Sequence, residues 1–173
     1  IKETLAASLI RLANWKGDTP LIDPFCGSGT IAIEACLIAQ NIAPGFNREF
    51  VSEQWNIMPA NIYDDYRDEA DKMADYDKEI EVYASDIDPE MVEIAKRNAE
   101  EVGLSDIIKF SVKDVNTLTI DTEEPVALIG NPPYGERIGD REEVEEMYRY
   151  IGTLLKQHPH LSAYILTSNK EFE

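Results

Sequence analysis

The most constraining feature of this sequence is a glycine-containing loop between a short apolar strand and a helix that is apolar almost all round. The strand is expected at Leu21–Asp23, the loop at residues 24–29 and the helix over residues 30–40. A helix without a polar face must be covered on all sides, so it is expected to lie against a sheet. Gly27 and Gly29 let the backbone pass close to a ligand, where a Cβ would clash. The segment therefore predicts a strand–loop–helix unit that binds a ligand at the loop.

Strands and helices alternate along the rest of the chain. Apolar runs and turn signals predict further strands over residues 80–85, 107–112, 125–130 and 161–168. Helical spacing predicts helices over residues 2–15, around 62–73, over 89–102 and over 142–157. This alternation predicts an α/β fold with a doubly wound, mostly parallel sheet.

In three of the expected helices, residues recur at helical spacing and so mark one face of the helix. The first helix is expected to be amphipathic, with Leu5, Ser8, Leu9 and Leu12 at helical spacing. The helix within the long connection at residues 41–79 carries four residues on one face: Ile62, Tyr66, Ala70 and Met73. The last helix is expected to face inward with Val144, Met147, Tyr148, Ile151 and Leu155.

Composition excludes several classes of protein. With 43% apolar residues, the chain is not disordered by composition, and no apolar run approaches a membrane span. Cys26 and Cys36 form no CxxC pair and no Cys/His cluster, so no metal is expected. The first residues lack a secretory cleavage pattern, so we expect a cytoplasmic protein without a membrane partner.

The net charge of −18 limits the possible partners. Residues 64–106 and 121–146 are strongly acidic, whereas an enzyme that acts on nucleic acid normally presents a basic face to the phosphates. Either the substrate is not a polyanion, or another segment holds it.

Acidic residues follow two further strands. Asp86 ends the second expected strand, where a carboxylate can bind both hydroxyls of a ribose. Asp88 is expected to cap the next helix, with Pro89 at its first position. Asp114 follows the third strand and can accept a hydrogen bond from an adenine amino group, although it is equally well an ordinary loop residue.

The NPPY motif, Asn131 to Tyr134, follows the fourth expected strand directly. An exocyclic amine on a base is a poor nucleophile, because its lone pair is delocalised into the ring. The Asn131 side-chain oxygen and the Pro132 carbonyl can accept its two N–H groups and localise that lone pair, while Pro132 and Pro133 stiffen the loop. Tyr134 offers a flat face on which a flipped-out base can stack. The alternative is a proline-rich turn without a catalytic role.

Together these motifs resemble the amino-methyltransferases of nucleic-acid bases. The finer resemblance is to the THUMP-associated class I methyltransferases dependent on S-adenosyl-L-methionine (SAM), a group that includes N6-adenine-specific DNA methylases and 23S rRNA guanine-N2 methyltransferases. The matching segments run through nearly the whole chain and are KETLAA at 2–7, DPFCGSGTIAIEA at 23–35, APGFNR at 43–48, SDIDPEMVEIAKRNA at 85–99 and NPPYGERIG at 131–139.

The resemblance implies a Rossmann-like methyltransferase sheet with the strand order 3-2-1-4-5, whose terminal strands are missing. It implies that residues 1–173 are a catalytic-domain fragment with a family-specific insertion at about 41–79. The RNA-binding THUMP part is absent, so the resemblance implies that rRNA, the expected partner, is held mainly outside this fragment. A basic surface on the missing part would then explain why this fragment can be acidic.

The resemblance also implies the site. It places the methionine end of SAM at Asp23, Cys26 and Gly27 with Thr4 nearby, the ribose at Asp86, and the adenine at Ile87 and Asp114. The full set of implied cofactor-binding residues is Thr4, Asp23, Phe25, Cys26, Gly27, Ser28, Gly29, Thr30, Asp86, Ile87, Asp114, Val115 and Asn131. The implied catalytic residues are Asn131, Pro132, Pro133 and Tyr134.

The expected function is SAM-dependent methyl transfer to guanine N2 of 23S rRNA, an rRNA-processing reaction of an RNA-binding transferase. The motifs themselves serve an N6-adenine DNA methyltransferase equally well, and the resemblance favours the guanine enzyme. A non-catalytic SAM- or RNA-binding module is the remaining alternative, but such a module need not keep Asn131 and Tyr134.

Overall fold

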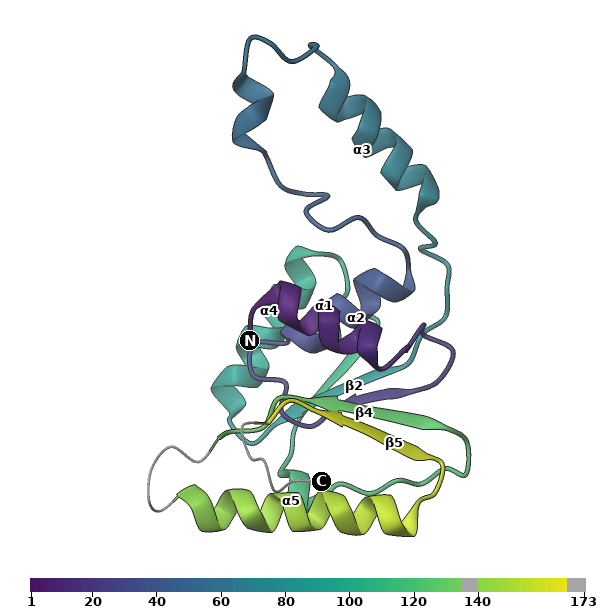
Figure 1. Ribbon diagram of the computed structural model, residues 1–173, viewed down its shortest axis with the longest axis vertical. Helices are drawn as coiled ribbons and strands as arrows, with labels where there is room; N and C mark the ends of the chain where they lie inside the picture. The colour runs from purple at the N-terminus through teal and green to yellow at the C-terminus, as the bar shows by residue number, and fades with distance from the viewer. Residues whose placement is uncertain (135–139, 168–173) are drawn as a thin grey trace.

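The structure is a computed structural model that describes residues 1–134 and 140–167, and it contains a five-stranded sheet (Figure 1). The strands are β1 (Leu21–Asp23), β2 (Val82–Asp86), β3 (Ile108–Val112), β4 (Val126–Gly130) and β5 (Leu161–Ile165). Every pair is parallel and the order is β3-β2-β1-β4-β5. The doubly wound sheet and its strand order are therefore confirmed. Ser168, the expected end of the last strand, lies outside the described residues.

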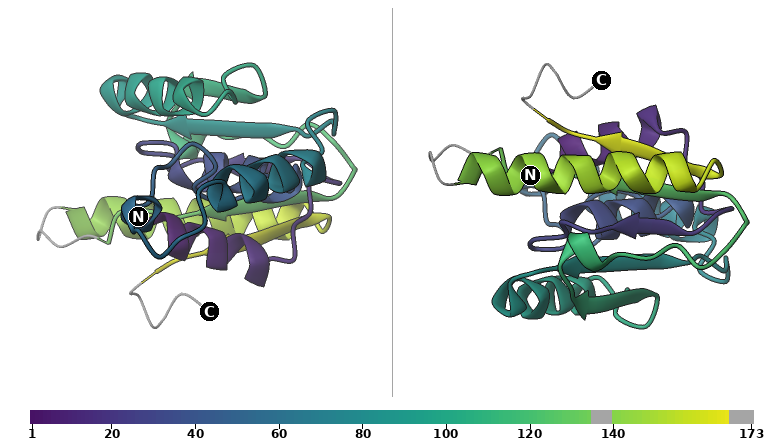
Figure 2. Two further views of the ribbon diagram at one scale, coloured as in Figure 1. Left: turned by 90° about the horizontal axis from the view of Figure 1, so that it is seen from above. Right: turned by 90° about the horizontal axis from the view of Figure 1, so that it is seen from below.

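Helices cover both faces of the sheet (Figure 2). The helices of the chain are α1 (Glu3–Leu12), α2 (Thr30–Ala39), α3 (Ile62–Met73), α4 (Pro89–Glu101) and α5 (Asp140–Gln157), with short 3-10 turns η1 (Val51–Gln54) and η2 (Val115–Thr117). Helices α1, α2 and α4 lie over one face and α5 lies over the other, as Figures 1 and 2 show. No helix in the described part of the chain is long and apolar enough to cross a membrane.

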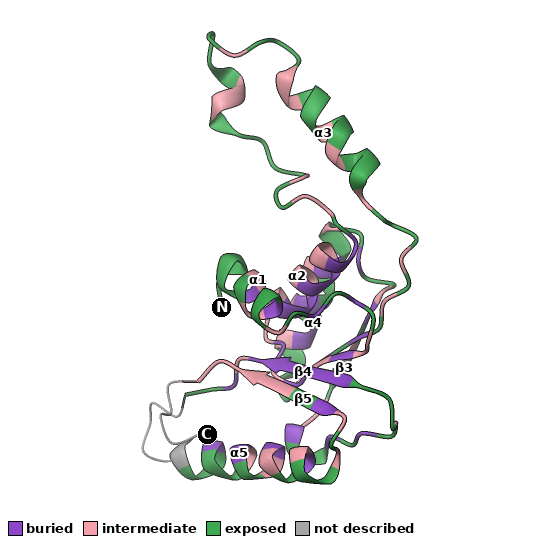
Figure 3. Cartoon of the chain, turned by 45° about the vertical axis from the view of Figure 1, so that its right-hand side comes forward, coloured by how far each residue is buried: buried purple, intermediate pink, exposed green. Residues whose placement is uncertain are grey.

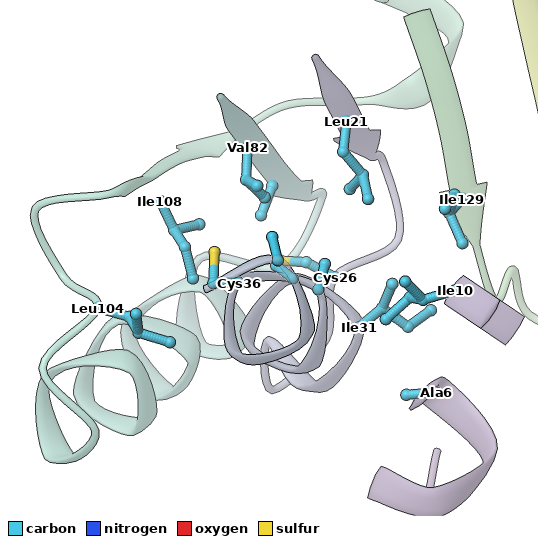
Figure 4. Packing of buried hydrophobic residues seen from close by; sticks show 14 of the residues in the cluster. Ala6, Ile10, Leu21, Cys26, Ile31, Cys36, Val82, Leu104, Ile108 and Ile129 are labelled. Carbon is cyan, nitrogen blue, oxygen red and sulfur yellow. The ribbon is translucent and has the colours of Figure 1, made fainter. Parts of the chain in front are cut away.

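The main core lies between the sheet and α2, as expected for a helix without a polar face (Figure 4). Leu21 of β1 and Val82 of β2 are fully buried against Ile31 and Cys36 of α2. Burial of each large apolar side chain contributes about 1.5–3 kcal/mol. This layer fixes the start of α2, and with it the loop at residues 24–29.

Helix α1 buries only part of the face that its leucines suggested, because Leu9 packs against the core but Leu5 and Leu12 do not. Ala6 and Ile10 are fully buried, whereas Leu5 is 45% exposed and Leu12 is 79% exposed. The helix packs against α2, and a small residue such as Ala6 lets two helices approach closely. The largest side chains therefore do not mark the contact face of this helix.

Residues 41–79, which we call the arm, project away from the helix layer as a hairpin of η1 and α3 (Figures 1 and 3). The expected helix is present, but neither η1 nor α3 contains a buried residue, and Tyr66 and Met73 are 64% and 62% exposed. The apolar face of α3 is therefore not buried in this domain.

Contacts within the arm hold its two halves together. The rings of Phe50 and Tyr63 stack at 6.0 Å, the Tyr63 hydroxyl donates to Ser52 Oγ at 2.6 Å, and Arg67 pairs with Glu53. These contacts make the arm an ordered element with a small packing cluster of its own.

Candidate active site

A cavity of about 390 Å³ lies at the carboxyl ends of β1, β2 and β4. The direction of strand order reverses between β1 and β4, and ligands of open α/β sheets bind at this position. Its volume falls in the range of small-molecule sites. Its wall consists of Ile1, Pro24, Phe25, Cys26, Gly27, Ser28, Thr30, Ile31, Asp86, Ile87, Met91, Lys113, Asp114, Val115, Asn131, Pro133 and Met147.

The loop after β1 is held by its own backbone amides. Four of the five N–H groups of residues 25–29 donate within the protein: Phe25 to Asp23 Oδ1 at 3.1 Å, Cys26 to the Ser85 carbonyl at 2.9 Å, Gly27 to Asp86 Oδ2 at 2.9 Å, and Gly29 to the Cys26 carbonyl at 2.7 Å. The Ser28 N–H has no partner among the described residues. The loop is therefore rigid and leaves one backbone donor for a ligand.

Hydroxyl groups lie beside that donor. Ser28 Oγ and Thr30 Oγ1 are 3.3 Å apart, and both residues line the cavity. Helix α2 begins at Thr30, so its unpaired N-terminal amides favour an anionic group here. A Cβ added at Gly27, where φ is +50°, would meet no atom within 4 Å, so the space beside this residue is open. This end of the cavity suits a carboxylate.

Asp86 joins the loop to the end of β2. Its Oδ2 accepts from the Gly27 N–H, and its Oδ1 accepts from the Asp88 N–H at 3.0 Å. A carboxylate has about four acceptor positions, so Asp86 can still accept two hydroxyls from the cavity. The cap predicted at Asp88 is confirmed, because its Oδ1 accepts from the Glu90 N–H at 2.8 Å.

Asp23 lies beneath the loop and outside the cavity wall. Its side chain is fully buried, and its Oδ2 has no hydrogen-bond partner among the described residues. Burial raises the pKa of Asp23 to about 7; the Phe25 N–H opposes this rise and the Asp86 charge adds to it. Burial, with the nearby carboxylates of Asp23 and Asp86, also raises the pKa of the Cys26 thiol to about 12.

The opposite end of the cavity is more apolar. Ile87, 68% exposed, and the buried Val115 line it with Asp114, whose Oδ1 accepts from the Asn116 N–H at 2.9 Å. Met91 also belongs to this wall, although it is absent from the predicted site. Its sequence signal is a large apolar residue that falls outside the buried stripe of α4.

The loop after β4 brings two of its four predicted residues into the same cavity wall. Asn131 and Pro133 line the cavity, Pro132 is fully buried, and Tyr134 is 43% exposed. The Tyr134 hydroxyl donates to the Asn131 side-chain oxygen at 2.6 Å. Met147 of α5 completes this part of the wall and was also not predicted as a site residue.

The structure gathers eleven of the predicted site residues in the cavity wall and leaves five outside it: Thr4, Asp23, Gly29, Pro132 and Tyr134. Thr4 is exposed on α1. A Cβ added at Gly29 would lie 3.0 Å from the Cβ of Ala95, so this glycine allows α4 to pack on the loop. Among the described residues, no group of three or more His, Cys, Asp or Glu side chains could hold a metal ion.

The chain is similar to proteins that are described as RNA methyltransferases. YpsC of Bacillus subtilis (strain 168), which is named as an RNA methyltransferase, is 53% identical over all of this chain. The ribosomal RNA large subunit methyltransferase K/L of Shewanella frigidimarina (strain NCIMB 400) is 41% identical over 91% of the chain. The matches cover 45% and 23% of those two proteins, so the chain spans less than half the length of these relatives.

Solved structures match the whole chain. A predicted N6-adenine-specific DNA methylase from Listeria monocytogenes str. 4b F2365 has a TM-score of 0.95 at 50% identity, over 45% of that protein. SMU.472, a methyltransferase complexed with SAH, has a TM-score of 0.94 at 43% identity, over 46% of that protein. The family described as RMKL-like, methyltransferase domain, matches residues 1–173. The chain therefore belongs to the RMKL-like methyltransferase domain family.

Proposed function

We propose that this domain binds SAM and directs its methyl group to an exocyclic amino group of a nucleic-acid base, the N2 amine of guanine in 23S rRNA. The observation that carries the proposal is the position of Asn131 in the wall of the cavity that also contains Asp86 and Ser28. An acceptor for an amine thus lies in the same cavity as groups suited to an adenosine and to a carboxylate.

The described residues fit SAM in one orientation. Asp86 would accept the two ribose hydroxyls, Asp114 would accept the adenine amino group, and Ile87 and Met91 would flank the adenine ring. The methionine carboxylate would lie at the Ser28 N–H and the start of α2, where donors are free. When bound, SAM supplies a methyl group that an amine nucleophile can take from its positively charged sulfur. SMU.472, solved with SAH, supports SAM as the cofactor.

The loop after β4 prepares the target amine. The Asn131 side-chain oxygen, in the cavity wall, accepts one N–H of the amine and directs the nitrogen lone pair away from the ring. Pro132 is buried outside that wall, so its carbonyl accepts the second N–H only after a shift of this loop. No side-chain base is required before transfer, because the amine proton becomes acidic only afterwards. The contribution of the protein is therefore positioning and electrostatic stabilisation.

In the structure the Tyr134 hydroxyl donates to the Asn131 side-chain oxygen. It occupies one of the two acceptor positions of this oxygen and so competes with the target amine for it. In the proposed function the base replaces this hydroxyl, and the Tyr134 ring, already 43% exposed, stacks on the base.

The RNA substrate is supported by the K/L rRNA methyltransferases and by YpsC, whereas the Listeria protein is described as acting on DNA. The test is to delete the gene for the full-length protein and to digest the cellular RNA and DNA. Loss of N2-methylguanosine from 23S rRNA is the expected result. Loss of N6-methyladenine from DNA instead would replace guanine by adenine as the target.

The net charge of −18 indicates that RNA capture depends on other parts of the protein. The 173-residue chain alone is expected to bind SAM but not to methylate rRNA at a useful rate. A methyl-transfer assay that compares this chain with the full-length protein at equal SAM occupancy measures the difference. Equal rates would mean that RNA capture lies within these residues.

A further inference from the structure

We propose that Asn98 of α4 is a positioning residue for the methionine end of SAM. This inference rests on the orientation of SAM proposed above, and it assigns to α4 a role in cofactor binding that its motif does not indicate. Asn98 lies outside the cavity wall and acts through the backbone of Ser28.

The Asn98 side-chain amide donates to the Ser28 carbonyl at 2.8 Å, across 70 residues of sequence. The other end of the same peptide group is also fixed, because the Gly29 N–H donates to the Cys26 carbonyl at 2.7 Å. The Ser28–Gly29 peptide is thus held on both sides by hydrogen bonds, and only one of the two comes from the loop itself.

This bond matters because of the residues on either side of Ser28. Gly27 and Gly29 have φ angles of +50° and +86°, and glycine has more backbone freedom than any other residue. The Gly27 and Gly29 N–H groups are already bonded to Asp86 and Cys26, so the Asn98 bond is the one that fixes the carbonyl of the residue between them. By holding the Ser28 carbonyl on the α4 side, Asn98 keeps the free Ser28 N–H in place for the carboxylate.

Helix α4 contacts the loop at two points on one face. Ala95 packs against Gly29 and Asn98 binds Ser28, and positions three residues apart share a helix face. Asp86, from β2, holds the neighbouring Gly27 N–H. Two separate elements therefore hold the loop: β2 at Gly27, on the ribose side, and α4 at Ser28, on the methionine side.

This division predicts a ligand-selective defect. In the full-length protein, Asn98→Ala is expected to lower the affinity for S-adenosylhomocysteine about two- to tenfold, which corresponds to the loss of one hydrogen bond. The same variant should bind methylthioadenosine, which lacks the amino-acid end, within about twofold of the wild-type affinity. Calorimetric titration with both ligands measures this, and Asn98→Ser repeats the test if the alanine variant fails to fold.

Two matched variants serve as controls. Asn41→Gly removes a similar bond, from Asn41 Nδ2 to the Met73 carbonyl at 2.9 Å, at a residue whose φ of +53° suits glycine. It should leave both affinities unchanged. Asp86→Asn should lower the affinity for both ligands, because both contain the ribose.

Equal losses for the two ligands in Asn98→Ala, or no loss for either, would overturn the role of Asn98. A loss confined to methylthioadenosine would overturn the proposed orientation of SAM as well. Neither result depends on RNA methylation, so the test is independent of the proposed target base.

Discussion

Two loops border the cavity, and the structure holds them in different ways. Residues 24–29 are fixed by backbone hydrogen bonds to β2, by Asp86 and by the Asn98 side chain. In residues 131–134 the Tyr134 hydroxyl donates to the Asn131 side-chain oxygen, a contact within the loop itself. In the proposed function, the first loop meets a cofactor of constant shape, whereas the second must admit a base from a large polymer.

The difference shows where preorganisation helps and where it would hinder. A rigid cofactor loop lowers the ordering cost of binding, because its groups are already in place. A target loop that makes its own hydrogen bond must exchange that bond when the substrate arrives. Four variants test this contrast, in descending order of expected effect.

Asn131→Ala in the full-length protein tests the target loop. We expect turnover to fall about 100-fold or more, because one preorganised acceptor is lost, while SAM affinity changes little. Methyl-transfer kinetics on rRNA and calorimetry with SAM measure the two quantities. Turnover that stays within a few-fold of wild type would remove Asn131 from amine activation.

Asp23→Asn tests the buried acid beneath the cofactor loop. Burial raises the pKa of Asp23 to about 7 in the folded state, so the folded protein keeps this carboxyl protonated below pH 7. The stability that the bound proton provides is lost as the pH rises toward 7. The linkage slope of about 1.4 kcal/mol per pH unit gives a loss of about 2 kcal/mol between pH 5 and pH 7.

Urea unfolding of both proteins at several pH values measures this effect. Subtracting the asparagine variant removes the contributions of the other carboxylates, so the wild-type protein alone should show the additional decline. Parallel pH profiles for the two proteins would show that Asp23 is ionised in the folded state.

Asp86→Ala is expected to lower the affinity for SAM at least tenfold, which corresponds to about 1.4 kcal/mol of binding free energy. The structure adds a second cause, since the variant also loses the acceptors for the Gly27 and Asp88 amides. Asp86→Asn keeps one acceptor oxygen and should fall between alanine and wild type in calorimetric titrations. Wild-type affinity in the alanine variant would remove Asp86 from the site.

Tyr134→Phe should have the smallest effect, and it should raise activity rather than lower it. It keeps the stacking ring but frees the Asn131 oxygen, so kcat/KM on rRNA is expected to rise about two- to tenfold. Tyr134→Ala should lose tenfold or more, because stacking is lost. Tyr63→Phe, which removes a hydroxyl bond in the arm, is the control. A fall in kcat/KM for Tyr134→Phe would show that the hydroxyl assists catalysis.

Local sequence patterns were sufficient to predict much of this domain. Short runs rich in apolar residues, from three residues at 21–23 to eight at 161–168, located every strand, and Asp88 with Pro89 located the start of α4. The glycine loop and the NPPY motif were expected at strand ends, and a parallel sheet brings these ends to one edge. Eleven predicted site residues therefore share one cavity wall.

Contacts between distant segments could not be predicted in the same way. The face that α1 buries depends on the shape of α2, so the exposed Leu5 and Leu12 were misleading. Gly29 accommodates Ala95, and Asn98 reaches Ser28, only because α4 packs on the loop. Met147 enters the cavity wall from a helix that follows the target loop. Helical spacing placed Met147 on the inward face of its helix, but spacing does not show which distant segment a residue meets.

The burial of both cysteines has a practical consequence for labelling this domain. Cys26 and Cys36 are the two cysteines of the sequence, and burial raises the pKa of each thiol to about 12. Thiol reagents attack the thiolate, so the native domain should stay unmodified by maleimides near neutral pH. A cysteine introduced at Ile57, which is 86% exposed on the arm, would then be the single reactive thiol. A fluorophore at that position would report on the surroundings of the arm without perturbing the cavity.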